Sequence, residues 1–131
     1  MNYAKFAIVV LMMPILLSSC SKEYDDVVLP VEGNWSGFYG NDNNPPAINY
    51  NLIIKDGGVI GEANPSGQIK GTGTWNLSGN TFTAHYQWNS PLNTVFSLTA
   101  IYDPATKRLS GTWGLDKSAT DGGKWEVARS N

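Results

Sequence analysis

The chain contains one cysteine, one histidine and few charged residues among its 131 positions. A single cysteine cannot form an internal disulfide, and a lone histidine leaves no His/Cys cluster of the kind that binds zinc. A Ser-His-Asp triad needs a histidine base beside its nucleophile, but His85 alternates onto the outer face of its segment, among threonines. We therefore expect no catalytic residue, no metal site and no cofactor.

Positive charge is also scarce. After residue 19 the chain carries eleven acidic and eight basic side chains, a net charge of −3. A protein that binds nucleic acid is expected to carry a basic patch, so this balance argues against nucleic acid as a partner. It argues equally against electrostatic binding to anionic lipid headgroups.

Residues 1–19 have the organisation of an export signal. Lys5 is the only side-chain charge before an apolar run of twelve residues, from Phe6 to Leu17. A helix that spans a bilayer needs about 20 apolar residues, so this run is too short. A positive start, a short apolar stretch and small residues after it are typical of a cleaved secretory signal.

The signal ends in Leu17-Ser18-Ser19-Cys20. This motif resembles the lipobox of bacterial lipoproteins, a leucine and two small residues before a cysteine. The resemblance implies cleavage before Cys20 and acylation of its thiol and amino group, which would anchor the protein through palmitate-like chains in the outer membrane of the cell envelope. An ordinary signal with an incidental cysteine is the alternative.

Residues 20–32 are expected to form a tether, with its charges first and Pro30 near its end. The acidic residues Glu23, Asp25 and Asp26 lie close behind the cysteine. They are similar to the surface-export signals described for lipoproteins of the Bacteroidetes, which implies exposure at the cell surface. A merely solvated tether is the alternative.

From Gly33 onward, apolar and polar residues alternate with the period of two that is typical of β-strands. For example, Phe82, Ala84, Tyr86 and Trp88 share one face of their segment. The expected strands cover residues 34–39, 47–55, 59–63, 68–77, 80–88, 93–102, 107–115 and 123–130.

Turn sequences such as Asp56-Gly57-Gly58 and Ser78-Gly79 separate these segments. The connections are short, so each strand is expected to pair with the next. Closing such a sheet removes both of its exposed edges. The sequence therefore predicts an all-β domain over residues 33–131, an eight-stranded antiparallel up-and-down β-barrel, with a β-sandwich as the alternative.

The tripeptide Gly-x-Trp occurs four times, at residues 33–35, 73–75, 111–113 and 123–125. Its glycine and tryptophan share a strand face, and a small residue beside a large one fits the taper of a small barrel. A Gly-x-Trp in the first strand resembles the calycins, which are the lipocalins, fatty-acid-binding proteins and avidins. The resemblance implies a barrel that can hold a small molecule. Gly37 stands where avidins have the asparagine that binds biotin, and the Thr-Asp-Tyr motif of lipocalins is absent, so no particular ligand is implied.

Successive connections of an up-and-down barrel alternate between its two ends. The longer ones, 40–46, 64–67, 89–92 and 116–122, fall at one end, which is therefore the expected mouth. The tether would join the other, closed end, where Trp35 and Trp75 are expected to pack, so the mouth would face away from the membrane. The candidate ligand-binding residues near the mouth are Trp88, Trp113, Trp125, Tyr39, Tyr50 and Tyr86.

Aromatic walls suit a small apolar or aromatic ligand, which tyrosine hydroxyls can orient. We expect non-enzymatic ligand binding, unless these rings fill the barrel completely. A second hypothesis is a protein-interaction or inhibitor module that contacts an envelope protein through outward apolar residues. Those residues are Phe38, Ile53, Ile60, Val95 and Ile101. A third is a glycan-acting enzyme with paired carboxylates, but the inward positions assigned by alternation hold almost no acids.

Overall fold

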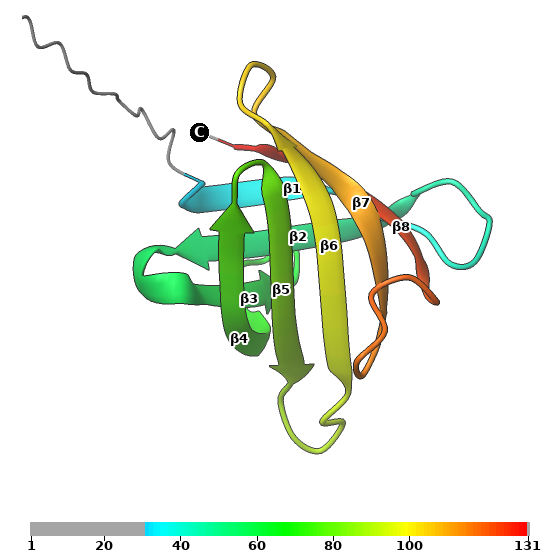
Figure 1. Ribbon diagram of the computed structural model, residues 1–131. Helices are drawn as coiled ribbons and strands as arrows, with labels where there is room; N and C mark the ends of the chain where they lie inside the picture. The colour runs from blue at the N-terminus through cyan, green and yellow to red at the C-terminus, as the bar shows by residue number, and fades with distance from the viewer. Residues whose placement is uncertain (1–30, 131) are drawn as a thin grey trace, which may run out of the picture.

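The strands form one closed antiparallel sheet, in which each strand pairs with the next and the last pairs with the first. The computed structural model describes residues 31–130. Figure 1 shows the sheet curving until β8, in red, returns beside β1. The predicted up-and-down barrel is confirmed, and the sandwich is excluded. The strands are β1 (Gly33–Tyr39), β2 (Ile48–Lys55), β3 (Val59–Ala63), β4 (Ile69–Ser78), β5 (Thr81–Trp88), β6 (Val95–Asp103), β7 (Arg108–Leu115) and β8 (Gly123–Arg129).

The predicted leader, the lipobox with Cys20 and the tether as far as Pro30 lie outside the described residues. Within residues 31–130, the structure contains no helix long and apolar enough to cross a membrane. Its one helical element is the single 3-10 turn η1 (Asp56–Gly58) between β2 and β3, in which Gly57 has a φ of 78°. This left-handed conformation explains why glycine occupies the turn.

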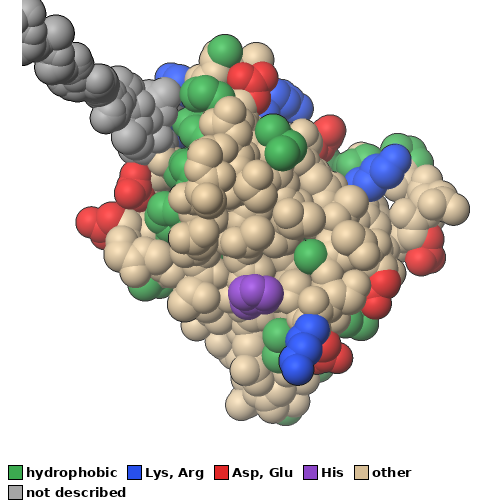
Figure 2. All heavy atoms as spheres, in the orientation of Figure 1, with side chains coloured by type: hydrophobic (Ala, Val, Ile, Leu, Met, Phe, Trp, Pro, Cys, Tyr) green, Lys and Arg blue, Asp and Glu red, His purple; other side chains and the backbone are tan. Residues whose placement is uncertain are grey.

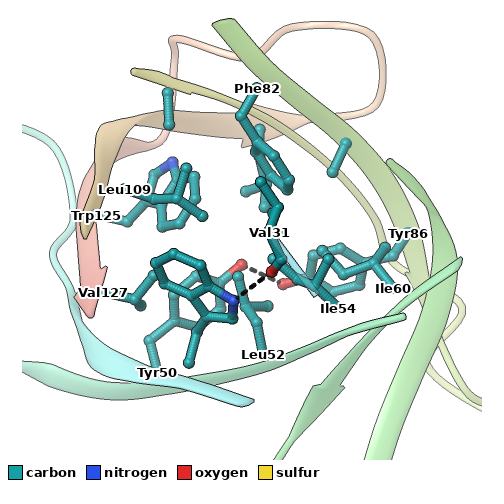
Figure 3. Packing of buried hydrophobic residues seen from close by; sticks show 14 of the residues in the cluster. Val31, Tyr50, Leu52, Ile54, Ile60, Phe82, Tyr86, Leu109, Trp125 and Val127 are labelled. Carbon is teal, nitrogen blue, oxygen red and sulfur yellow. Dashed lines mark hydrogen bonds between the residues drawn. The ribbon is translucent and has the colours of Figure 1, made fainter. Parts of the chain in front are cut away.

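Alternate residues of every strand point into the barrel and form its apolar core. On β2, for example, Tyr50, Leu52 and Ile54 are buried, while Asn49 and Lys55 on the opposite face are exposed. Figure 3 shows side chains from different strands converging in the interior. The apolar side chains thus leave water on the inner face of a sheet that has no free edge.

Ile60 on β3 corrects one sequence prediction. We expected it to face outward, but its side chain is fully buried and lies in the core (Figure 3). The outward residue is Val59, which is 43% exposed. β3 carries apolar residues on both faces, so alternation alone does not fix which face is inside. A shift of one residue exchanges the two faces completely.

The closed end of the barrel is plugged by Val31. Its side chain is buried, and its carbonyl oxygen accepts a 2.9 Å hydrogen bond from the Trp35 indole (Figure 3). Trp75 also lies at this end, where it donates to the carbonyl of Lys55 and stacks on Phe82. Both tryptophans were predicted here, whereas Val31 was expected to belong to the tether.

The longer connections, 40–47, 64–68, 89–94 and 116–122, all lie at the opposite end from Val31, and the short turns lie on its side. Figure 1 shows the β1–β2 loop in cyan at the right, with the β5–β6 and β7–β8 loops below. The β1–β2 loop is fastened to the last hairpin, because Gly40 N–H donates to Lys124 O at 2.9 Å and Asp42 N–H to Gly122 O at 2.7 Å. The rim of the mouth is therefore built from hydrogen-bonded segments.

The structure confirms that the histidine lies on the outer surface of the barrel. His85 is exposed on β5, as Figure 2 shows, and its Nδ1 lies 2.8 Å from Ser97 Oγ. Of the apolar residues expected to face outward, Phe38 and Ile101 are exposed by 44% and 58%. Ile53 and Val95 also face outward and are half-buried.

Candidate ligand-binding site

A cavity of about 120 Å³ lies at the open end of the barrel, and its wall is mostly aromatic. Five of the six predicted ligand-binding residues line it, and Trp125 does not. The sequence prediction missed Asn41, Glu62, Phe96 and Leu98. The complete lining consists of Tyr39, Asn41, Tyr50, Glu62, Tyr86, Trp88, Phe96, Leu98 and Trp113.

Five of the aromatic side chains form a closed ring of contacts around the cavity. The Tyr39 ring lies edge-on to Tyr50 and to Trp113, with centroid distances of 5.5 and 5.8 Å. Phe96 packs against Trp113 at 5.9 Å and against Tyr86 at 5.2 Å. A 2.8 Å hydrogen bond between the hydroxyls of Tyr50 and Tyr86 completes the ring. Each ring is thus held by its neighbours, so the wall is preorganised.

Trp113 is the part of this wall that belongs to a Gly-x-Trp tripeptide. Its indole N–H donates to the carbonyl of Gly40 at 2.9 Å, which ties the wall to the rim. Gly111 shares its strand face, and a Cβ there would lie 1.9 Å from the Thr99 carbonyl oxygen. The glycine therefore permits a close approach of β6 to β7, and the tryptophan fills the space nearer the mouth.

Trp125 lies behind the cavity rather than in its wall. It is 1% exposed, and its ring contacts Tyr50 at 5.8 Å and Phe82 at 6.3 Å. Its indole N–H donates to Thr112 O at 2.8 Å. Trp125 thus connects the aromatic wall with the core of the closed end.

Glu62 on β3 is the acid that the sequence prediction missed. It is 5% exposed, and its Oε1 accepts hydrogen bonds of 2.7 Å from both the Tyr86 hydroxyl and the Trp88 indole N–H. Because the single hydroxyl proton of Tyr86 goes to Glu62, the Tyr50 hydroxyl must be the donor to Tyr86. The result is a directed chain of hydrogen bonds that ends on a buried carboxylate.

A β-bulge supplies the positive partner of Glu62. Ala63 pairs with Ile69 while Glu62 pairs with Gly71, so Lys70 is the extra residue of β4. Bulges re-aim side chains, and the Lys70 Nζ lies 3.5 Å from Glu62 Oε2. The same ammonium lies 4.8 Å from the centroid of the Trp88 ring.

Burial raises the pKa of the Tyr50 hydroxyl well above its usual value, and the negative charge of Glu62 raises it further. The pKa of Tyr86 is raised well above its usual value first by burial and then by Tyr50 and Glu62. An ionised phenol would lie close to a carboxylate in a site with little water, so both hydroxyls stay protonated at neutral pH. They therefore remain donors within the chain of hydrogen bonds.

The register of the β2–β3 hairpin is the signal that could have found Glu62. The tight turn at Asp56–Gly58 sets Ile54 opposite Ile60 and Leu52 opposite Glu62. Opposite residues share a sheet face, so the inward face of β2 determines the inward face of β3. Ile60 and Glu62 share one face of β3, so the incorrect outward prediction for Ile60 also excludes Glu62 from the interior.

The cavity offers one carboxylate, that of Glu62, surrounded by aromatic side chains. Glu62 is the only acid among the nine lining residues, so no pair of carboxylates meets there. In the part of the chain from residue 31 to 130, no three His, Cys, Asp or Glu side chains gather as they would around a metal ion.

The barrel and its cavity define a class of architecture, a small closed barrel with an aromatic pocket at one end, which is consistent with the calycin-like fold that the Gly-x-Trp motifs implied. The chain matches no known protein family, no curated protein and no solved structure.

Proposed function

We propose that the protein binds a small molecule in the open-end cavity and does not transform it. The cavity itself is the observation that carries this proposal. The aromatic side chains leave a space of about 120 Å³ unfilled beside the cluster of buried apolar side chains that forms the core. Small-molecule sites are concave and mostly apolar, with a few polar groups that fix the orientation of the ligand. The ring of aromatic side chains and Glu62 fit that description.

The volume of the cavity limits the size of the group that it can hold. A cavity of about 150 Å³ holds a benzene molecule, so a space of about 120 Å³ accepts one compact apolar or polar-apolar group. A larger ligand would extend past Asn41 and between the loops of the mouth. Tyr39 and Trp113 would then contact the part of the ligand that enters first.

We also propose that a lipid on Cys20 anchors the protein in the outer membrane of the cell envelope. The lipobox sequence supports the modification, and the acidic residues that follow it favour the cell surface over the periplasmic face. Val31 is the first described residue and lies at the closed end. A tether that reaches the barrel there would leave the mouth facing away from the lipid.

A contact with another envelope protein has less support. Of the outward apolar residues predicted to make this contact, only Phe38 and Ile101 are exposed, and they lie on β1 and β6, two strands that do not pair. Scattered apolar side chains are ordinary on a protein surface. The small-molecule proposal is therefore the stronger one.

Tryptophan fluorescence and native mass spectrometry of the full-length protein, purified in non-ionic detergent, test the proposal. A panel of small neutral, cationic and anionic aromatic molecules should include binders that quench the wild-type protein and co-migrate with it. Trp88→Ala should abolish this binding. Trp75→Ala is the matched control, because Trp75 is also half-buried and hydrogen-bonded but lies at the closed end. Unchanged binding by Trp88→Ala, or no binder in the panel, would refute the proposal.

A further inference from the structure

We infer that the group bound in the cavity is a compact ammonium, either a primary amine or its methylated form. Its positive charge would face the Glu62 carboxylate, and its methylene or methyl groups would face the surrounding rings. The inference rests on the proposed function and adds to it the charge of the ligand.

The buried carboxylate sets the sign of that charge. Glu62 lines the cavity and is 5% exposed. A second negative charge brought into the cavity would be repelled where little water can screen it. A positive charge would instead be attracted, and it would receive from Glu62 the interaction that replaces its lost hydration.

The aromatic wall also favours a positively charged group. The face of an aromatic ring carries negative electrostatic potential, and it binds ammonium groups when the cation lies within about 6 Å of the ring centroid. Six aromatic side chains line the cavity, and their mutual contacts hold them around it. Quaternary ammonium groups are recognised by aromatic cages of this kind.

Lys70 shows that a cation fits this combination of groups. Its ammonium contacts Glu62 Oε2 at 3.5 Å and lies 4.8 Å from the centroid of the Trp88 ring. Lys70 is not part of the cavity lining, and its side chain is 41% exposed. Its ammonium can therefore return to water when a ligand ammonium approaches Glu62 from inside the cavity.

Three hydrogen-bond donors of the wall, on Trp88, Tyr86 and Trp113, are already used by protein acceptors. The N–H of Trp88 and the hydroxyl of Tyr86 donate to Glu62, and the N–H of Trp113 donates to Gly40. Tyr50 donates to Tyr86, which leaves the lone pairs of the Tyr50 oxygen able to accept. Around Glu62 and Tyr50 the wall thus offers acceptors to a ligand, as a primary ammonium requires.

Two probes of the same shape test the charge. Choline and 3,3-dimethylbutan-1-ol differ in that a neutral carbon replaces the charged nitrogen. Each is titrated by calorimetry into the full-length protein in non-ionic detergent, at low and moderate salt. We expect choline to bind at least roughly tenfold more tightly than the neutral alcohol, the difference that one or two cation–π contacts supply.

Three variants test which side chains cause the difference in affinity between choline and the neutral alcohol. Glu62→Gln keeps the side-chain volume and an acceptor oxygen, and it should reduce the preference for choline to the part that the aromatic rings supply. Lys70→Met removes the competing ammonium, and it should tighten choline binding several-fold without changing the affinity for the alcohol. Lys55→Met, at an exposed position of the closed end, should change neither affinity. Lys70→Met keeps the test valid if Glu62→Gln fails to fold.

The outcomes separate the two proposals. Equal affinity for both probes, or a choline affinity that Lys70→Met weakens, overturns the ammonium inference and leaves small-molecule binding standing. The same holds if only neutral or anionic members of the aromatic panel bind and depend on Trp88. If neither probe nor any member of the panel binds, both proposals fail.

Discussion

The indole N–H of Trp88 donates to Glu62 at 2.7 Å, although β4 lies between the strands that carry the two residues. Gly71 is the residue of β4 that pairs with Glu62 on one side and with Trp88 on the other. A Cβ at Gly71 would lie 2.6 Å from the Gln87 carbonyl oxygen and 2.9 Å from the Trp88 Cα. The missing side chain allows β4 and β5 to approach closely and Glu62 to reach across β4.

Gly71→Ala should therefore destabilise the protein by about 2 kcal/mol, because the added methyl group meets backbone atoms that cannot move aside. Urea unfolding followed by tryptophan fluorescence measures the change. Gly61→Ala is the control, since the nearest atom to its Cβ would be 3.5 Å away. That variant should stay within about 0.5 kcal/mol of the wild type, and equal losses at the two positions would refute the explanation.

Replacing Glu62 should separate its acceptor role from its charge. Glu62→Ala leaves the Trp88 N–H and the Tyr86 hydroxyl without their acceptor, and each unpaired buried donor costs about 1–3 kcal/mol. We expect a total loss of about 2–6 kcal/mol in chemical unfolding. Glu62→Gln keeps one acceptor oxygen and should lose clearly less. A Gln variant as unstable as the Ala variant would show that the charge, rather than the hydrogen bonds, holds this site together.

Stability should fall in alkaline solution because of the buried tyrosines. The pKa values of Tyr50 and Tyr86 are raised well above the usual value of 10.0, so the unfolded chain releases these protons at lower pH than the folded protein does. The stabilisation is complete below pH 10 and is lost as pH rises above it, by about 1.4 kcal/mol per pH unit for each group. Unfolding measured between pH 9 and pH 11.5 gives this slope, and Tyr50→Phe should reduce it by one such increment. An unchanged slope in that variant would contradict the assignment.

Val31→Ala should loosen the closed end. The valine side chain is 3% exposed, and truncating it removes apolar burial worth about 1.5 kcal/mol and leaves a small void. Glu32→Ala, at the next and only half-buried position, should change the unfolding free energy by less than about 0.5 kcal/mol. If both variants unfold like the wild type, Val31 does not seal the barrel.

Cys20→Ala tests the anchor. Without the thiol there is no acceptor for the diacylglycerol, so metabolic labelling with palmitate should disappear and the leader should be retained or cut elsewhere. Ser21→Ala, the neighbouring substitution, should leave labelling intact. Palmitate incorporated normally into Cys20→Ala would exclude Cys20 as the lipidated residue.

Strand positions followed directly from the sequence, because a two-residue period with turn residues between segments is a local property. The depth of each residue in the barrel was harder to predict. Trp125 lies near the start of β8, which predicts a position at the mouth, yet it packs between Tyr50 and Phe82. Strands in a barrel are tilted and staggered, so distance from a strand end does not measure distance from the mouth.

Alternation, short connections and loop length were enough to predict an eight-stranded barrel, its closed and open ends and five of the aromatic residues around its cavity. The position of Glu62 in the cavity wall depends on strand pairing in the folded barrel. Its strand is apolar on both faces, so the pairing with β2 had to choose the inward one. A carboxylate can be buried there because Tyr86, Trp88 and Lys70, brought from β5 and β4, satisfy it together.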